Sequence, residues 1–152
     1  MWVLFVCLGN ICRSPAAEAV FAQLADERGL SGVDVDSAGT ADYHEGETAH
    51  RNTLGEAAQR GVPIDHRSRP VAAADFDRFD LLVAVDRTTE RNLRRIAPPS
   101  TDLAKIVRLG DYAPGGLDVT DPWGHPQQAY TEMWDQLVEL CGALLDAITE
   151  PA

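Results

Sequence analysis

The sequence predicts an α/β fold, with residues 1–152 forming a single three-layer domain in which a four-stranded parallel sheet carries helices on both faces. Three observations support this prediction. Apolar runs of strand length alternate with helical segments along the chain. One run, Leu81–Val85, is apolar throughout, as a strand buried on both faces of a parallel sheet requires. The length of 152 residues suits one domain with a substantial core.

The individual elements follow from apolar runs, helical periodicity and glycine breaks. The expected strands are Trp2–Val6, Val33–Ser37, Leu81–Val85 and Lys105–Leu109. The expected helices are Pro15–Arg28, Arg51–Arg60, a short helix or turn at Phe76–Phe79, Arg87–Ile96 and Gln127–Ile148. Because helices alternate with strands, the connections are crossovers and the strands run parallel.

Composition and charge argue against several classes of function. A net charge of −11 makes nucleic acid an unsuitable partner. No apolar run approaches the length of about 20 residues that a membrane span needs, and the N-terminus lacks the basic start of a signal peptide. The odd number of cysteines, 3, favours a reducing cytoplasm over a disulfide framework. We therefore expect a cytoplasmic protein without a nucleic-acid or membrane partner, and a monomer.

The most informative stretch is Val3–Pro15, which reads VLFVCLGNICRSP. An apolar strand ends in Cys7, five residues follow, and Arg13 precedes a helical segment. The backbone N–H groups of such a loop and the positive end of the helix dipole converge on one point. The guanidinium adds a planar fork that matches a phosphate. A thiolate within this phosphate-binding loop (P-loop) is the machinery of cysteine-dependent phosphoryl transfer.

The residues inside the loop have expected mechanical roles. Gly9 can take a positive φ and lets the backbone approach a ligand closely. Asn10 tolerates the left-handed region and can brace the turn. The hydroxyl of Ser14 can donate a hydrogen bond to the sulfur of Cys7, and Pro15 suits a first helical turn.

The run Cys7–Pro15, CLGNICRSP, closely resembles the low-molecular-weight protein tyrosine phosphatase family, which carries the same run after its first strand. The resemblance implies a flavodoxin-like or Rossmann-like sheet of the phosphotyrosine phosphatase I type, without a metal or other cofactor. It implies hydrolysis of phosphotyrosine in proteins, and of small aryl phosphates, through a phosphocysteine on Cys7, with phosphate as product and inhibitor. It also implies that the substrate phosphate is bound by Leu8, Gly9, Asn10, Ile11, Cys12, Arg13 and Ser14.

Ester cleavage needs a general acid for the departing oxygen, and the segment Leu117–Gly124 offers one. In the resembling family, a D-P-aromatic segment late in the chain supplies the acid and one wall of the pocket. By this match Asp121 is the acid and later the base that activates water, with Asp111 and Asp118 as alternatives. Trp123 is the aromatic wall, in a D-P-W-G segment where the family commonly has D-P-Y-Y.

Further residues take roles from the same resemblance. Tyr43, after the segment S-A-G-T, matches the family's aromatic specificity position and is expected to form the opposite wall. Two aromatic walls around a deep slot favour phosphotyrosine over the shorter phosphoserine. Ser37 and His66 are expected to support Asn10 from behind, as structural rather than substrate-binding groups.

Three alternative functions remain on the same fold. A thioredoxin-coupled arsenate reductase needs two further mid-chain cysteines, and residues 75–95 contain none. A protein arginine phosphatase has Thr where this chain has Ile11. A non-hydrolytic phosphocysteine carrier would lack both the loop arginine and the late acid. Within the loop, Cys12 can either form a reversible disulfide with Cys7 or simply pack in the core.

Overall fold

A computed structural model describes residues 1–149 of the chain. Its strands are β1 (Trp2–Cys7), β2 (Asp34–Gly39), β3 (Leu81–Ala84) and β4 (Ile106–Arg108). Every neighbouring pair is parallel, in the order β2-β1-β3-β4, so the predicted four-stranded parallel sheet is confirmed. Strand β2 continues past its predicted end at Ser37, because it pairs with β1 as far as Cys7.

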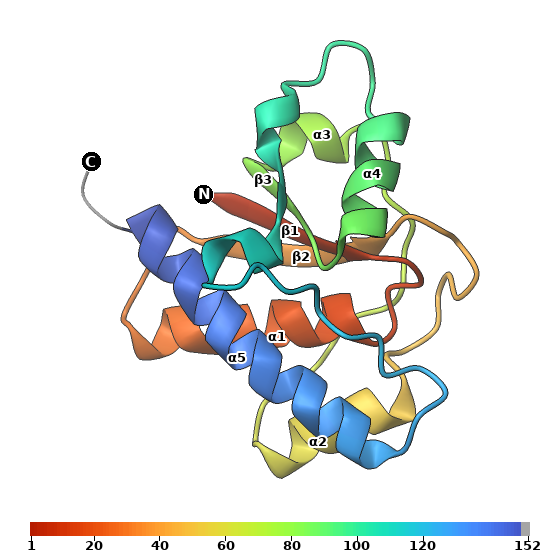
Figure 1. Cartoon of the computed structure of the whole chain (residues 1–152), viewed down its shortest axis with the longest axis vertical. Helices are drawn as coiled ribbons and strands as arrows, with labels where there is room; N and C mark the ends of the chain where they lie inside the picture. Colours follow the sequence, from red (N-terminus) through yellow and green to blue (C-terminus); the bar gives the residue numbers. More distant parts are fainter. Residues whose placement is uncertain (150–152) are drawn as a thin grey trace.

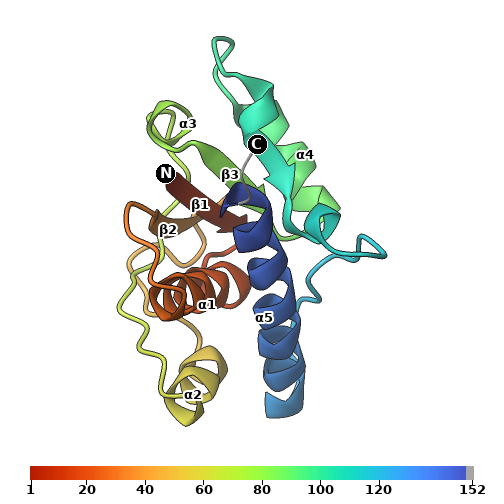
Figure 2. The same cartoon turned by 90° about the vertical axis from the view of Figure 1, so that its left-hand side faces the viewer.

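Helices lie on both faces of this sheet, as predicted. They are α1 (Arg13–Glu27), α2 (Arg51–Gln59), α3 (Asp75–Arg78), α4 (Arg87–Ile96) and α5 (Gln127–Thr149). Two 3-10 turns, Leu103–Lys105 and Leu109–Tyr112, flank β4. Helices α1 and α5 cover one face of the sheet and α3 and α4 the other, while α2 packs against α5 outside these layers (Figures 1 and 2).

The central strand β1 divides the hydrophobic core into two halves. Its alternate residues Val3 and Phe5 join the cluster formed with α1 and α5, whereas Leu4 and Val6 join the cluster formed with α3 and α4. All four side chains are fully buried. Burial on both faces explains why the strand lacks the polar alternation of a half-exposed strand.

The order of the strands fixes where a ligand can bind. From β1 the chain moves first to β2 on one side and later to β3 on the other, so the strand order reverses between β1 and β3. In open α/β sheets, ligands bind beyond the carboxyl ends of the strands at such a point. Cys7 ends β1, and Asp86 follows β3 at the same edge.

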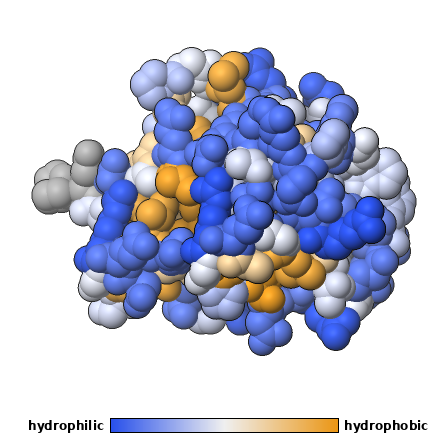
Figure 3. Space-filling view, turned by 90° about the horizontal axis from the view of Figure 1, so that it is seen from below, coloured by the Kyte–Doolittle hydropathy of each residue, from blue (hydrophilic) through white to orange (hydrophobic). Residues whose placement is uncertain are grey.

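The surface of the protein is largely polar. The face seen from below is mostly hydrophilic, with apolar patches between the polar side chains (Figure 3). Among residues 1–149, no helix combines the length and the apolar character that a membrane crossing requires.

Candidate active site

The loop between β1 and α1 wraps around the sulfur of Cys7. The backbone N–H of Asn10 donates to Sγ at 3.3 Å, and the Ser14 hydroxyl oxygen lies 3.0 Å from it. Asn10 takes the left-handed conformation, with φ at 57°. Gly9 does not use the positive φ that is open to a glycine, because Asn10, which was expected to tolerate the left-handed region, makes this turn. Space at position 9 is tight, since a Cβ there would lie 3.1 Å from Cδ2 of His44, whose ring would have to shift by a few tenths of an ångström.

The side chain of Asn10 organises a buried network beneath the loop. Its Nδ2 donates to Ser14 Oγ at 2.7 Å and to Ser37 Oγ at 3.0 Å. Its Oδ1 accepts from His66 Nε2 at 2.7 Å and from the backbone N–H of Arg69 at 3.0 Å, so both ends of the amide are satisfied. Because Ser14 Oγ accepts from Asn10, its own proton can be donated to the sulfur of Cys7, which at 3.0 Å is nearer than the alternative acceptor, the carbonyl of Ala38 at 3.5 Å.

The structure thus brings together Asn10, Ser14, Ser37 and His66, as expected for a support of the loop. The side chains of Asn10 and Ser14 are fully buried behind the loop and do not line the pocket. They support the loop from behind.

A titratable cluster that the sequence analysis did not find lies one layer deeper. Glu18 Oε1 accepts from the Ser37 hydroxyl at 2.7 Å, and burial raises the pKa of Glu18 to about 7. Nδ1 of His66 lies 3.4 Å from both Glu18 Oε1 and Asp36 Oδ1, and burial lowers the pKa of His66. The position of Glu18 one helical turn after Ser14 was the signal that could have placed it on this face of α1.

The cluster consists of residue types that can bind a metal ion. Ligand atoms of Glu18, Asp36 and His66 lie within 4.8 Å of one another. Each of these side chains already has a protein partner: Glu18 bonds to Ser37, Asp36 accepts from Arg69 at 3.0 Å, and His66 bonds to Asn10. The cluster therefore acts as a hydrogen-bonded support of the loop.

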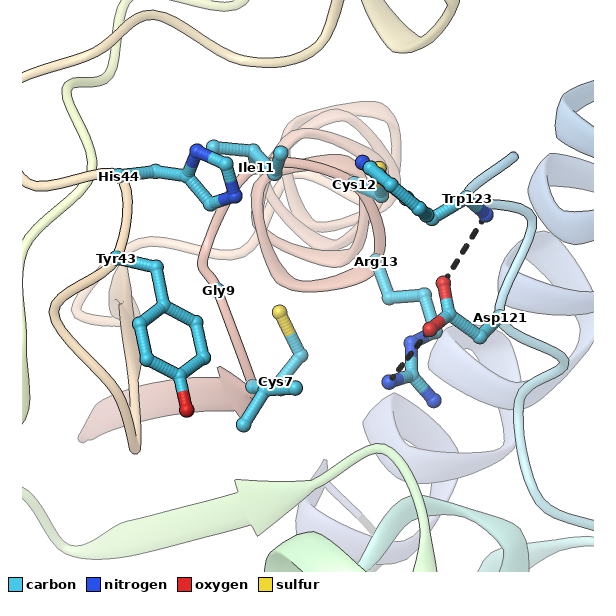
Figure 4. A pocket seen from close by; sticks show the side chains of 10 residues that line it. Cys7, Gly9, Ile11, Cys12, Arg13, Tyr43, His44, Asp121 and Trp123 are labelled. Carbon is cyan, nitrogen blue, oxygen red and sulfur yellow. Dashed lines mark hydrogen bonds and ion pairs between the residues drawn. The ribbon is translucent and has the colours of Figure 1, made fainter.

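The guanidinium of Arg13 is held from behind. Its Nη1 donates to Asp86 Oδ2 at 2.6 Å and to the carbonyl of Val119 at 3.1 Å. Burial opposes its charge, but Cys7 and Asp86 outweigh this effect and raise the pKa of Arg13. The other nitrogen, Nη2, faces Asp121 on the pocket side, 3.8 Å from Oδ2 (Figure 4).

Asp86 is the residue that sequence reasoning missed most clearly. It forms the N-cap of α4, where Oδ1 accepts from the backbone N–H of Thr89 at 2.7 Å. Burial favours its neutral form, but the hydrogen bonds from Thr89 and Arg13 outweigh burial and lower the pKa of Asp86. The sequence pattern that could have identified Asp86 is an aspartate that follows a buried strand and directly precedes a helix, which is typical of a helix N-cap.

The loop that carries Asp121 is fixed at its root. The backbone N–H of Val119 donates to the carbonyl of Val85 at 2.9 Å. Gln136 of α5 binds both neighbours of Val119: it donates to the carbonyl of Asp118 at 2.9 Å and accepts from the N–H of Thr120 at 3.2 Å. These contacts hold Asp121 over the pocket.

The structure separates the three candidate acids. Asp111 and Asp118 pair with Arg108 at 2.7 Å and 2.8 Å, away from the pocket of Cys7. Asp121 lines the pocket, with its Oδ1 accepting from the backbone N–H of Trp123 at 3.1 Å.

A pocket of about 240 Å³ opens above the loop. It is lined by Cys7, Leu8, Gly9, Ile11, Cys12, Arg13, Tyr43, His44, Asp121 and Trp123. Tyr43 and Trp123 lie on opposite sides of Cys7 and are 72% and 60% exposed, so their rings form a rim (Figure 4). His44 was not expected from the sequence, although it follows the expected rim residue Tyr43 directly.

The three cysteines differ in surroundings, although all are free thiols. Cys12 Sγ lies 3.7 Å from the hydroxyl of Tyr130, and burial raises the pKa of Cys12 to about 11. Cys141 is fully buried in α5, and burial raises its pKa as well. Cys7 combines a place in the pocket with hydrogen bonds to its sulfur, so it is the candidate nucleophile.

The fold and this loop define a class of α/β proteins that bind an oxyanion between a cysteine and an arginine at the end of the first strand. The model of one family, "Low molecular weight phosphotyrosine protein phosphatase", matches residues 2–151. A low molecular weight protein-tyrosine-phosphatase of Streptomyces coelicolor is 42% identical over 97% of this chain and 93% of its own length. The chain therefore belongs to this family.

Solved structures agree with this assignment. A protein tyrosine phosphatase from Entamoeba histolytica superimposes with a TM-score of 0.92 and 36% identity, covering 97% of this chain and 96% of its own. A Drosophila arginine phosphatase superimposes with a TM-score of 0.94 and 30% identity, covering 100% of both chains. The shared fold thus accommodates more than one phosphorylated side chain.

Proposed function

We propose that this chain hydrolyses phosphotyrosine in proteins, and small aryl phosphates, with Cys7 as nucleophile, Arg13 as phosphate ligand and Asp121 as general acid. One observation carries this proposal: the sulfur of Cys7, bonded to Ser14 and to the N–H of Asn10, shares a pocket with Arg13 and Asp121. The family assignment supports it, because the similar Streptomyces and Entamoeba proteins are named as tyrosine phosphatases.

The first chemical step transfers the phosphoryl group to the enzyme. The thiolate of Cys7 attacks phosphorus in line, so that an S–P bond forms as the P–O bond to the phenol breaks. Loop N–H groups and Arg13 bind the equatorial oxygens, where charge is greatest. Asp121 gives its proton to the departing phenol oxygen.

The second step releases phosphate and restores the enzyme. Asp121, now a carboxylate, takes a proton from a water molecule, and the water oxygen attacks phosphorus. The S–P bond breaks, and the electron pair returns to Cys7 Sγ, where Ser14 and the N–H of Asn10 stabilise the thiolate. Inorganic phosphate leaves, and at high concentration it competes with substrate for the same loop.

The shape of the pocket favours an aryl ester. The rings of Tyr43 and Trp123 stand at the rim, and Ile11 adds an apolar wall beside the loop. A phenyl ring can stack between such walls while its phosphate reaches the loop. A phosphoserine places its backbone too near the rim to reach as deeply. We further propose that the chain acts as a monomeric cytoplasmic enzyme, in keeping with its free thiols.

A second candidate function is the hydrolysis of phosphoarginine, which the similarity to the Drosophila arginine phosphatase favours. Ile11 argues against it, because its side chain offers no hydroxyl to a guanidinium or to an attacking water.

The test compares a phosphotyrosine peptide, a phosphoserine peptide, phosphoarginine and arsenate in the presence of EDTA. We expect phosphotyrosine to have the highest kcat/KM and the Cys7→Ser variant to be inactive. Preferential hydrolysis of phosphoarginine, arsenate reduction as the main activity, or a requirement for added metal would overturn the proposal.

A further inference from the structure

A second groove adjoins the active-site pocket and has no part in the mechanism. It measures about 630 Å³ and shares Ile11, His44 and Trp123 with the pocket. Its remaining lining comes from the segment 46–51 and from Arg67. A peptide whose phosphotyrosine occupies the pocket must run over the rim, and an extended chain advances about 3.3–3.6 Å per residue. Residues flanking the phosphotyrosine therefore reach this groove.

Arg51 is one of two cationic side chains in the groove. It is exposed and occupies the first position of α2, where the helix dipole disfavours a positive charge. The first turn of α2 contains no acidic residue, and within residues 1–149 Arg51 forms no ion pair. The preceding His50 anchors this end of the helix, because its N–H donates to the carbonyl of Ile11 at 2.8 Å and its ring stacks on Tyr130. A charge in this position contributes little to helix stability.

Arg67 is the second cation, and the backbone holds it beside the same loop. It forms an antiparallel bridge with Thr48, and its Nη1 donates to the carbonyl of Gly46 at 3.2 Å. The hydroxyl of the neighbouring Ser68 donates to the carbonyl of Gly9 at 2.9 Å. Arg67 is exposed and, like Arg51, makes no ion pair in the described part of the chain.

Arg51 and Arg67 are cations in a protein with a net charge of −11. Six arginines pair with a carboxylate of this chain: Arg13, Arg28, Arg60, Arg69, Arg94 and Arg108. Within residues 1–149, Arg51 and Arg67 have no such partner, and they are the arginines that line the groove. Glu47, the acidic residue of the groove, is bonded to His44 at 2.6 Å. The groove therefore presents two cations without a carboxylate partner next to the pocket.

We propose that this groove binds an acidic side chain of the substrate protein close in sequence to the phosphotyrosine, and that Arg51 and Arg67 determine this specificity. The inference rests on the proposed function for the placement of the phosphotyrosine. The occupant is an aspartate or glutamate of an extended segment, since two arginines on a solvent-open groove match a carboxylate. Such contacts also draw an acidic segment towards an enzyme whose overall field repels it.

The experiment uses two phosphotyrosine peptides that differ in charge alone, one with glutamates and one with glutamines on both sides of the phosphotyrosine. The dissociation constant of each is measured with the Cys7→Ser protein, and kcat/KM with the active enzyme. We expect a preference for the glutamate peptide of about twofold to tenfold at low salt, because exposed ion pairs are weak. Raised salt should reduce this preference.

Variants assign the preference to the groove. The double variant Arg51→Ala/Arg67→Ala should lose it, and the double variant Arg51→Glu/Arg67→Glu should prefer the glutamine peptide. Arg95→Ala, which removes an exposed charge from the last turn of α4, should keep it. Hydrolysis of 4-nitrophenyl phosphate, which has no flanking residues, should change little in all of these variants.

Two results would overturn the inference: equal binding of both peptides by the parent protein, or an unchanged preference in the double alanine variant. An equal loss of the preference for the glutamate peptide in Arg95→Ala would also overturn it, because the preference would then arise from the net charge of the protein and not from the groove. The absence of phosphotyrosine hydrolysis in the active enzyme would refute the proposed function separately, since the binding preference is measured without turnover.

Discussion

Oδ2 of Asp86 lies 2.6 Å from Nη1 of Arg13 and fixes one edge of the guanidinium that we propose as the phosphate ligand. The carbonyl of Val119 binds the same nitrogen at 3.1 Å. With that nitrogen occupied, Nη2 faces the pocket. Asp86 and Arg13 follow different strands, so the contact joins β3 to the loop after β1 and aims the guanidinium before a ligand arrives.

The first prediction concerns this contact. Asp86→Asn keeps the side-chain shape and an acceptor for the N–H of Thr89, but it removes the charge that orients Arg13. A charge-assisted hydrogen bond contributes about 1.5–3 kcal/mol, so we expect kcat/KM for phosphotyrosine to fall about tenfold to a hundredfold. Inhibition by inorganic phosphate should weaken in parallel. Asp77→Asn, on exposed α3, serves as the control, and an unchanged phosphate inhibition constant in Asp86→Asn would contradict the assigned role.

The second prediction concerns the acid. Asp121→Asn should lower kcat/KM for phosphotyrosine by about 10²–10⁴, the usual contribution of a general acid. The loss should be smaller for aryl phosphates with more acidic phenols, because these leave without protonation. A plot of log kcat/KM against the pKa of the leaving phenol should therefore become steeper in the variant.

The rival carboxylates provide the matched controls for Asp121. Asp111→Asn and Asp118→Asn remove partners of Arg108, so they should affect stability more than the dependence on leaving group. If the dependence of log kcat/KM on the pKa of the leaving phenol became steeper in either of these variants and stayed unchanged in Asp121→Asn, the substituted residue would be the general acid instead of Asp121.

The third prediction concerns the pH dependence of stability. Burial raises the pKa of Glu18 from 4.5 to about 7 in the folded protein, so folding is penalised when the carboxyl ionises. The penalty is absent below about pH 4.5, grows as the pH rises towards 7, and is then constant. At about 1.4 kcal/mol for each pKa unit, it is on the order of 3 kcal/mol.

Glu18→Gln removes this penalty while keeping an acceptor for Ser37. Relative to the parent protein, the free energy of unfolding of the variant should therefore rise between pH 5 and pH 8, as measured by urea denaturation. Glu27→Gln, on the exposed end of α1, is the control and should show no such rise. A constant difference between Glu18→Gln and the parent would show that Glu18 ionises normally in the folded state.

Local sequence signals predicted much of this molecule. The strands and helices follow from apolar runs and helical spacing, and the uniformly apolar β3 reflects burial on both sides. Cys7 and Arg13 lie within one loop, so their spacing alone suggested a shared site. Asp121 could be predicted as the candidate acid because it lies in a distinctive D-P-aromatic segment.

The residues that were missed owe their positions to tertiary contacts. Asp86 reaches Arg13 because β3 lies beside β1, and His44 meets Gly9 through the loop after β2. Neither relationship leaves a repeating pattern in the sequence. Tertiary contacts also decide which loop residue takes the positive φ: the side chain of Asn10 is bonded at both ends, which stabilises the left-handed turn at Asn10 rather than at Gly9.

The most direct test of the account identifies the residue that carries the phosphoryl group. The enzyme is mixed with an aryl phosphate, quenched by denaturation at alkaline pH, where the S–P bond persists, and mapped by mass spectrometry of the peptide Met1–Arg13, with fragmentation that separates Cys7 from Cys12. We predict a phosphoryl group on Cys7 that persists in Cys12→Ala and is lost in Cys7→Ser. A phosphoryl group on Cys12, or turnover by Cys7→Ser at the parent rate, would contradict the proposed mechanism.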